Sequence, residues 1–174
     1  MANQQIECQS IKITKISKED TISLRHSVLW PDMPPEHVIL PEDELGVHYG
    51  AFLPHHSHPV AVVSLFVEAC PIDRPIEAQL SSNGTSLLKT KERAVRFRKF
   101  ACDPQYQGKG FGTQLLLHAL SIARSELGVQ VAWCDARRTT ESWYSKRGFV
   151  SFGNPFFKGP VEYIRMELDL NQLV

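Results

Sequence analysis

The sequence predicts a single α/β domain over residues 1–174, built on a mixed, mostly antiparallel sheet flanked by helices. Apolar stretches with strand and helix periodicity follow one another in the order β-α-β-β-β-α-β-α-β-β. In addition, 174 residues of which 43% are hydrophobic are enough to build one full core. Chain order and size together favour one domain over a repeat array or a disordered chain.

The first half of the chain is predicted to hold three strands and one helix. Residues 11–16 alternate apolar and polar side chains, while residues 60–67 are apolar almost throughout, as in a strand buried on both faces. The predicted elements are a strand at 11–16, a helix starting at 17–20, an irregular Pro-rich loop at 30–44, and antiparallel strands at 46–53 and 59–69.

The second half contains the clearest helical periodicity. Gly112, Leu115, Leu116, Ala119, Leu120, Ala123 and Leu127 fall on one face of a helix that Gly128 is expected to end. The predicted elements are a loop with a short helix at 70–90, strands at 94–102 and 129–134, a short helix at 139–146, and strands at 149–152 and 161–168.

A glycine-rich segment starts the long helix. Gly108, Gly110 and Gly112 alternate with Lys109 and Phe111 directly after a strand and a Pro turn. Glycines let the main chain approach a ligand closely, and the first amides of a helix attract anions. The spacing fits neither a P-loop nor a dinucleotide fingerprint. The segment therefore predicts a site for a diphosphate group.

The segment Gln107-Gly108-Lys109-Gly110-Phe111-Gly112 resembles the Q/R-x-x-G-x-G/A signature of the GNAT N-acetyltransferases. Downstream, Ala136-Arg137 and Trp143-Tyr144-Ser145-Lys146-Arg147-Gly148-Phe149 resemble a second segment of that family. The resemblance covers about residues 94–150, which would be the CoA-binding core. It implies the GNAT, or acyl-CoA N-acyltransferase, fold.

The resemblance also implies roles for individual residues. Main-chain amides from Gln107 to Thr113 would hold the CoA pyrophosphate, and the end of the 94–102 strand would pair with the pantetheine arm, leaving the thioester between that strand and the 129–134 strand. Tyr144 would donate a proton to the leaving thiolate. The implied cofactor-binding residues are Phe100, Ala101, Cys102, Gln107, Gly108, Lys109, Gly110, Phe111, Gly112, Thr113 and Arg137.

The activity implied is acetyl transfer from acetyl-CoA to a primary amine of a small molecule or peptide by direct attack. The alternative is a non-catalytic, CoA-binding regulatory module. Some family members carry a glutamate near the position of Arg96 that deprotonates the amine, but no carboxylate lies beside Arg96 here. The base stays open between His48, Glu68, Asp135 and a chain of water molecules.

Other features argue against further ligands. His55, His56 and His58 lie on a predicted hairpin tip, where a solvated turn is favoured over a metal site, so no metal is expected. Residues 89–99 are basic, but they run into a buried strand, and the formal net charge is zero, so no nucleic-acid partner is expected.

The cysteines and the apolar segments indicate a location. The four cysteines are widely spaced, which is typical of reduced thiols; Cys102 and Cys134 are interpreted as small buried side chains. No signal peptide and no membrane-spanning stretch is recognised. We therefore expect a cytoplasmic protein without a membrane partner. The acceptor and a homodimer are left open.

Overall fold

The computed structural model describes residues 10–71 and 93–173. Within them, one sheet has the strand order β1-β2-β3-β4-β5-β7-β6. The strands are β1 (Lys12–Ile16), β2 (Val47–Phe52), β3 (Ala61–Val67), β4 (Ala94–Cys102), β5 (Val131–Arg137), β6 (Val150–Lys158) and β7 (Val161–Asp169). The helices are α1 (Glu19–Leu29), α2 (Phe111–Leu127) and α3 (Glu141–Ser145). The predicted fold class and element order are confirmed.

The chain divides into two compact units, each made of two stretches of sequence. The first unit holds the residues up to Leu65 together with Lys99–Ala119, and the second holds Phe66–Arg98 together with the residues from Leu120 on. Strands β3 and β4 and helix α2 therefore each begin in one unit and end in the other.

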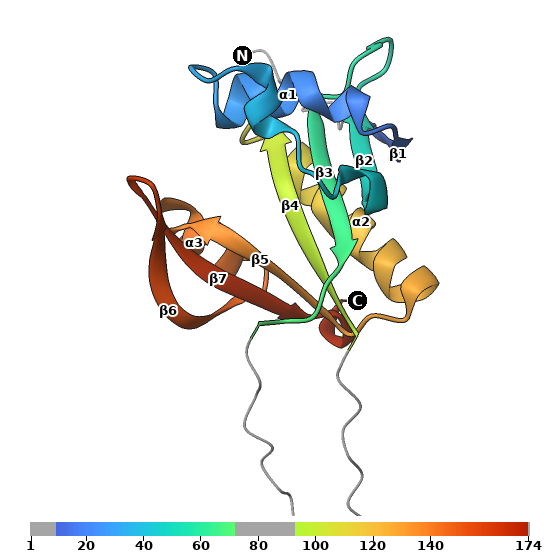
Figure 1. Ribbon diagram of the computed structural model, residues 1–174. Coiled ribbons are helices and arrows are strands. Elements are labelled where there is room, and N and C mark those ends of the chain that lie inside the picture. The colour runs from blue at the N-terminus through green and yellow to red at the C-terminus, as the bar shows by residue number, and fades with distance from the viewer. Residues whose placement is uncertain (1–9, 72–92, 174) are drawn as a thin grey trace, which may run out of the picture. The chain divides into compact units, whose positions relative to one another are not determined.

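The first unit is built on the antiparallel strands β1, β2 and β3 (Figure 1). Ile13 pairs with Ala51 on one side of β2, and Ala51 pairs with Ala61 on the other. β3 is buried from Ala61 to Phe66, as its apolar, β-branched sequence predicts. A buried strand of this kind fixes the position of the β2–β3 turn and of the end of β4, whose Asp103 amide donates to the Val60 carbonyl at 2.9 Å.

The second unit contains one parallel and two antiparallel strand pairs. β4 runs parallel to β5 over Ala94–Arg96, while β7 is antiparallel to both β5 and β6. On one side of this part of the sheet, the rings of Phe97, Tyr144 and Phe149 pack against one another with centroids 5.4 to 5.9 Å apart. This aromatic cluster connects α3 to the sheet.

Helix α2 has the predicted apolar face. Leu115, Leu116, Ala119, Leu120 and Ala123 are all at most 2% exposed. Gly128 ends the helix in the left-handed conformation (φ 62°), and its amide donates to the Arg124 carbonyl.

Two strands are longer than the sequence indicated. β5 continues past Cys134 to Arg137, because its polar residue Asp135 is opposite Arg165 of β7 and remains in the ladder. β6 continues past Phe152 to Lys158 through a register shift that accommodates Pro155. The Pro-rich segment 30–44 is irregular as expected, apart from short 3-10 turns at Pro35–Val38 and Asp43–Leu45.

Three predictions lie wholly or partly outside the described residues: the loop at 70–90, the start of the basic segment 89–99, and Cys8. Among the helices of residues 10–71 and 93–173, none is long and apolar enough to cross a membrane.

Candidate functional site

The glycine loop, which we define as Gln107–Gly112, joins β4 to α2. A 3-10 turn at Pro104–Tyr106 precedes it, and the Asp103 carboxylate caps this turn by accepting a backbone N–H at 2.9 Å. The next four residues are exposed. Gly108 and Gly110 have φ of 75° and 87°, a conformation that favours glycine. The loop therefore presents main-chain groups to solvent.

The third glycine permits close packing instead. A Cβ on Gly112 would lie 3.1 Å from Cζ of Phe100 and 3.8 Å from Cβ of Cys102. The Gln107 side-chain amide donates to the Cys102 carbonyl at 2.9 Å, which ties the other end of the loop to the same strand. The structure thus brings the predicted residues of β4 and of the loop together.

Cys102 is part of this packing. Burial raises the pKa of its thiol and the charge of Asp103 adds to that shift, while a hydrogen bond from the Gly112 amide opposes it. The thiol stays protonated at neutral pH, which agrees with its interpretation as a packing residue. One amide that we expected to hold pyrophosphate therefore already has a sulfur acceptor.

The start of α2 is anchored in the core and lies next to an exposed lysine. Phe111 is 5% exposed and packs with Leu53 and Val60, which anchors the helix end in the core. The Gln114 amide donates to the Gly110 carbonyl at 3.0 Å, so the amides before it belong to the first turn, where the helix dipole is positive. Lys109 is exposed, with Nζ 5.1 Å from the Tyr106 ring centroid. A diphosphate suits this combination of groups.

The end of β4 has an unusual backbone. Its register with β5 includes Ala94–Arg96 and no later residue of β4. Lys99 then has φ 51°, one of two non-glycine residues with positive φ in the described chain. Of the residues expected to pair with pantetheine, Phe100 and Cys102 are half-buried and Ala101 is buried.

Tyr144 lies in α3 and is enclosed. The residue is 8% exposed, and the ring of Trp143 packs against it edge-on at 4.9 Å, in addition to those of Phe97 and Phe149. Its hydroxyl is hydrogen-bonded to Sγ of Cys134. Burial, followed by the neighbouring Cys134, raises the pKa of the phenol well above its ordinary value. The group therefore keeps its proton at neutral and mildly alkaline pH.

Arg137, the other predicted cofactor residue of the second unit, is the last residue of β5. It is half-buried, and its carbonyl accepts a hydrogen bond from Oγ1 of Thr140 at 2.8 Å, where the chain turns toward α3.

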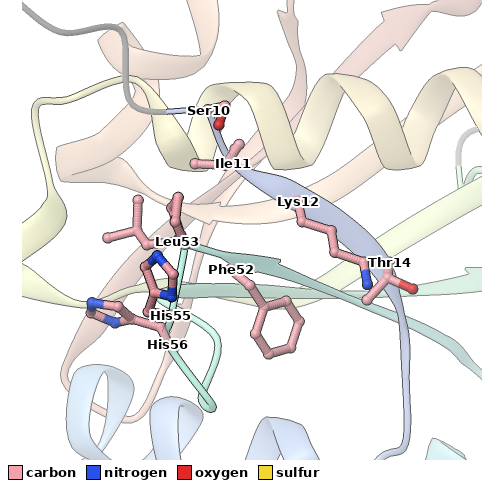
Figure 2. Close-up of a pocket in the computed structure, with 9 residues that line it drawn as sticks. Ser10, Ile11, Lys12, Thr14, Phe52, Leu53, His55 and His56 are labelled. Carbon is pink, nitrogen blue, oxygen red and sulfur yellow. The ribbon is translucent and has the colours of Figure 1, made fainter.

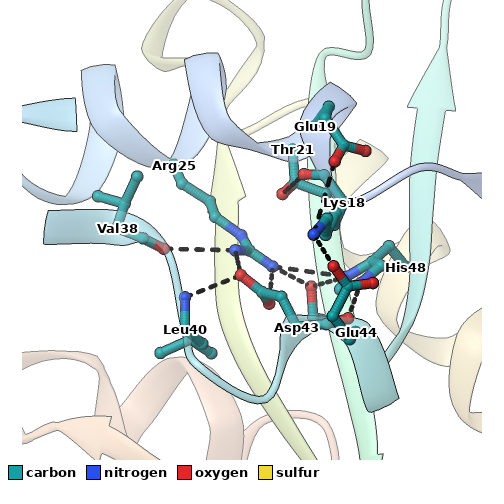
Figure 3. Close-up of polar contacts among 10 residues, drawn as sticks. Lys18, Glu19, Thr21, Arg25, Val38, Leu40, Asp43, Glu44 and His48 are labelled. Carbon is teal, nitrogen blue, oxygen red and sulfur yellow. Dashed lines mark hydrogen bonds and ion pairs between the residues drawn. The ribbon is translucent and has the colours of Figure 1, made fainter. Parts of the chain in front are cut away.

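His48, one of the open candidates for the base, belongs to a buried polar cluster (Figure 3). Its Nδ1 lies 2.7 Å from Oγ of Ser64 and its Nε2 lies 3.0 Å from the main-chain oxygen of Asp43. Arg25, fully buried, donates to both carboxylate oxygens of Asp43 at 2.7 and 3.0 Å and to Ser64 at 2.6 Å. Both ring nitrogens of His48 are thus engaged in the interior.

This cluster fixes α1 and the 3-10 turns to the sheet. Arg25 lies on α1 and Asp43 on the 3-10 turn Asp43–Leu45. His48 lies on β2 and Ser64 on β3. Burial alone would raise the pKa of Asp43, but hydrogen bonds from Arg25 and the Leu40 amide outweigh it and lower that pKa. The cluster has the character of a structural ion pair.

Glu68 and Asp135, the two carboxylate candidates, both contact Arg96. Its guanidinium donates to Glu68 at 2.9 Å and to Asp135 at 2.5 Å, and lies over the Trp133 ring at 4.5 Å. Asp135 also contacts Lys158 at 2.7 Å. The Asp135 side chain is 9% exposed, whereas that of Glu68 is 43% exposed. The sequence near Arg96 lacks a carboxylate, but the fold supplies two.

The turn that carries His55, His56 and His58 joins β2 to β3, as predicted, and all three imidazoles are exposed. Among the residues that the structure describes, no group of three or more His, Cys, Asp and Glu side chains gathers as metal ligands would. His56 instead packs edge-on against Tyr106 at 5.9 Å.

Two features were missed by the sequence reasoning. The contact between Cys134 and Tyr144 joins residues ten positions apart and has no sequence signal. The ion pair of Arg25 did have a sequence signal. Arg25 falls among the apolar residues of its helix, where a charged side chain needs a buried partner.

Comparisons with known proteins agree with this geometry. A sequence model of the acetyltransferase (GNAT) domain matches residues 76–151. Over 148 residues, the chain is 29% identical to YitI of Bacillus subtilis, described as an uncharacterised N-acetyltransferase; the match covers 84% of the chain and 87% of YitI.

Solved structures show the same fold. FeeM, an N-acyl amino acid synthase from uncultured soil microbes, superposes with a TM-score of 0.67 at 12% identity, covering 94% of this chain and 93% of FeeM. The ribosomal-protein-S18-alanine N-acetyltransferase of Escherichia coli superposes with a TM-score of 0.64 at 16% identity, covering 92% and 94%. The chain is thus similar to GNAT N-acetyltransferases over part of its sequence, and it has the fold of these solved structures.

Proposed function

We propose that the protein transfers an acetyl group from acetyl-CoA to a primary amine of a small molecule or peptide. The observation that carries the proposal is the exposed glycine loop. Its Gly108 and Gly110 have left-handed backbone conformations and directly precede helix α2, whose first residue packs in the core. A diphosphate bound there places the remainder of CoA nearby. The register of β4, which leaves β5 after Arg96, supports pairing of the pantetheine arm with Phe100–Cys102.

The reaction is a direct attack. The amine nitrogen forms a bond to the thioester carbonyl carbon, and the resulting tetrahedral intermediate expels the CoA sulfur when the C–S bond breaks. Tyr144 donates its phenol proton to that thiolate, and the acceptor nitrogen loses a proton to a base. The raised pKa of Tyr144 supports the role, because the donor remains protonated when the thiolate leaves.

Glu68 is the carboxylate that best suits the base. Both ring nitrogens of His48 have hydrogen-bond partners, and Asp135 is buried against three cationic side chains. Glu68, in contrast, contacts Arg96 and is still exposed to solvent. A solvent-exposed carboxylate can pass the amine proton to water. We expect Glu68→Gln to lower kcat/KM by about tenfold or more, and an unchanged kcat/KM would assign the proton directly to water.

The test is a panel of amines, comprising polyamines, amino acids, aminoglycosides, peptides and arylamines, scored by release of the free CoA thiol from acetyl-CoA. We expect release with at least one class in the wild type and much less with Tyr144→Phe. Tight acetyl-CoA binding without thiol release in any class would contradict the proposal, and would instead favour the non-catalytic CoA-binding module.

A further inference from the structure

The amine that receives the acetyl group needs a binding site, and the two units differ in what they offer it. On the first unit, a groove of about 430 Å³ lies between β1 and the β2–β3 turn (Figure 2). Lys12, His55 and His56 line it, and none of its nine lining residues is acidic. An amine binds as an ammonium ion, and this lining gives that ion no counter-charge. The second unit, in contrast, carries charges of both signs on one face.

These charges lie on the face of the sheet opposite Tyr144. Successive residues of a strand point to opposite faces. Cys134, whose thiol contacts the Tyr144 hydroxyl, is followed directly by Asp135. Asp135 therefore faces away from Tyr144, together with its β7 partner Arg165 and with Arg96 of β4, which contacts Asp135 at 2.5 Å. An acceptor on this face would leave the proposed acid and its aromatic surroundings undisturbed.

The charged network, which we define as Glu68, Arg96, Asp135, Lys158 and Arg165, has one positive charge in excess. Lys158 lies 2.7 Å and Arg165 lies 3.6 Å from the buried Asp135 carboxylate, which Arg96 also contacts. Glu68 supplies the second negative charge through Arg96. The remaining charged side chains at the same face positions of β4, β5 and β7 are two of each sign: Arg98, Arg137, Glu167 and Asp169. A ligand group with one negative charge would balance this face.

The two outer cations of the network are held by aromatic rings. Phe156 of β6 and Tyr163 of β7 are stacked, with centroids 5.9 Å apart. Nζ of Lys158 lies 4.9 Å from the Tyr163 centroid, and Cζ of Arg165 lies 4.9 Å from the Phe156 centroid. The two cationic side chains are still 49% and 33% exposed. Because the rings and the buried carboxylate already restrict them, binding a ligand would cost little further ordering.

We propose that this face binds the acceptor, and that the acceptor carries a carboxylate, held by Lys158 and Arg165, in addition to its amine. The proposal deepens the proposed acetyl transfer and rests on it. A carboxylate accepts hydrogen bonds from both cations and brings the one negative charge that the network lacks, whereas a phosphate monoester would bring about two. Glu68, the proposed base, joins the same network through Arg96 and supplies a proton acceptor for the amine. Amino acids and short peptides belong to this class.

The test uses pairs of acceptors that differ only in the carboxylate, namely amino acids and dipeptides, each with its primary amide. Thiol release from acetyl-CoA by the full-length protein gives kcat/KM for both members of a pair. The readout is the ratio of acid to amide, because a loss of folding or of acetyl-CoA binding lowers both members alike. Arg124→Gln is the matched control, since Arg124 is an exposed arginine of α2 that contacts the Leu173 carbonyl outside the charged network.

We expect the wild type and Arg124→Gln to prefer the acid by about tenfold or more, as a hydrogen bond between charged groups would provide. Lys158→Gln should lose at least about threefold of this preference, mainly through KM for the acid, and Lys158→Arg should retain most of it. The double variant Lys158→Gln/Arg165→Gln should turn over acid and amide alike. Acetyl-CoA affinity should be the same in all variants.

Equal kcat/KM for both members of every pair in the wild type, or a preference that survives in the double variant, would overturn the proposal and leave acetyl transfer intact. Turnover only with amines that lack a carboxylate, such as polyamines, would do the same. If melting curves show that the double variant does not fold, the single variant Lys158→Gln decides. No thiol release with any amine would remove the proposed function, and this proposal with it.

Discussion

In the glycine loop the groups offered to a ligand are main-chain groups of the exposed residues 107–110, whereas around Tyr144 a single phenol hydroxyl is enclosed by aromatic rings. The loop depends on backbone conformation, with φ of 75° and 87° at Gly108 and Gly110. The Tyr144 region depends on packing, and the partner of its phenol, Cys134, is a weak hydrogen-bond acceptor.

From this difference we propose different tasks for the two regions. An exposed array of amides can bind an anionic ligand without rearrangement. A buried hydroxyl stays protonated, and it can still donate its proton because its hydrogen bond to the Cys134 thiol is weak. We therefore expect substitutions in the loop to change cofactor affinity and substitutions around Tyr144 to change turnover.

The largest effect is expected for Gly110→Asp. The variant forces a side chain into a left-handed position and places a negative charge where we propose that the diphosphate binds, so acetyl-CoA affinity should fall by about a hundredfold or more. Calorimetric titration measures the loss.

The matched control for that variant is Gly159→Asp, at φ 58° with nothing within 4 Å of its Cβ. It likewise places an aspartate at a positive φ, on the turn between β6 and β7. Similar weakening in both variants would mean that the loop glycines matter only for folding.

The second effect concerns Tyr144→Phe, which keeps the ring and removes the hydroxyl. Stability and acetyl-CoA affinity should stay near those of the wild type, because the lost hydrogen bond goes only to a thiol. The turnover number kcat should fall by at least about tenfold, as expected for loss of a positioned acid. Wild-type turnover in this variant would reduce Tyr144 to a packing residue.

A smaller effect is expected for Cys134→Ala. The phenol loses the partner that orients it, and kcat should decrease by about threefold to tenfold, on the scale of one modest hydrogen bond. Cys134→Ser retains a partner and should recover most of the rate. If Cys134→Ala instead weakens acetyl-CoA binding with kcat preserved, the proposed division of tasks is wrong.

The smallest expected change is in the pH profile. Because burial raises the pKa of Tyr144, the phenol remains protonated where an ordinary tyrosine, with a pKa of about 10, begins to ionise. No alkaline decrease in kcat should therefore arise from Tyr144 below about pH 10. A decrease below that pH which is absent from the residual rate of Tyr144→Phe would contradict the enclosed position of the phenol.

The sequence predicted the loop better than the surroundings of Tyr144 for a physical reason. Gly108 and Gly110 are required by local backbone conformation, so their spacing is visible in the sequence. The apolar periodicity of α2 is local in the same way. Element order and the start of α2 at the loop were therefore predictable.

Contacts between distant residues were not predictable. Glu68, Arg96 and Asp135 meet only because β3, β4 and β5 are neighbours in the sheet, and their register depends on the whole fold. Likewise, His48 was a candidate base until its buried contacts with Ser64 and Asp43 were seen. A polar residue in a predicted strand does not reveal which hydrogen-bond or ion-pair partners it has in the fold.

The most direct test of the account is the melting temperature of the wild-type protein as acetyl-CoA is added. A ligand that binds only the folded state stabilises it by about 2.7 kcal/mol at a hundred times its dissociation constant, so the midpoint should rise with the logarithm of acetyl-CoA concentration. The same titration of Gly110→Asp should be flat. A wild-type midpoint unchanged at millimolar acetyl-CoA would contradict the central claim that the glycine loop binds the acetyl donor.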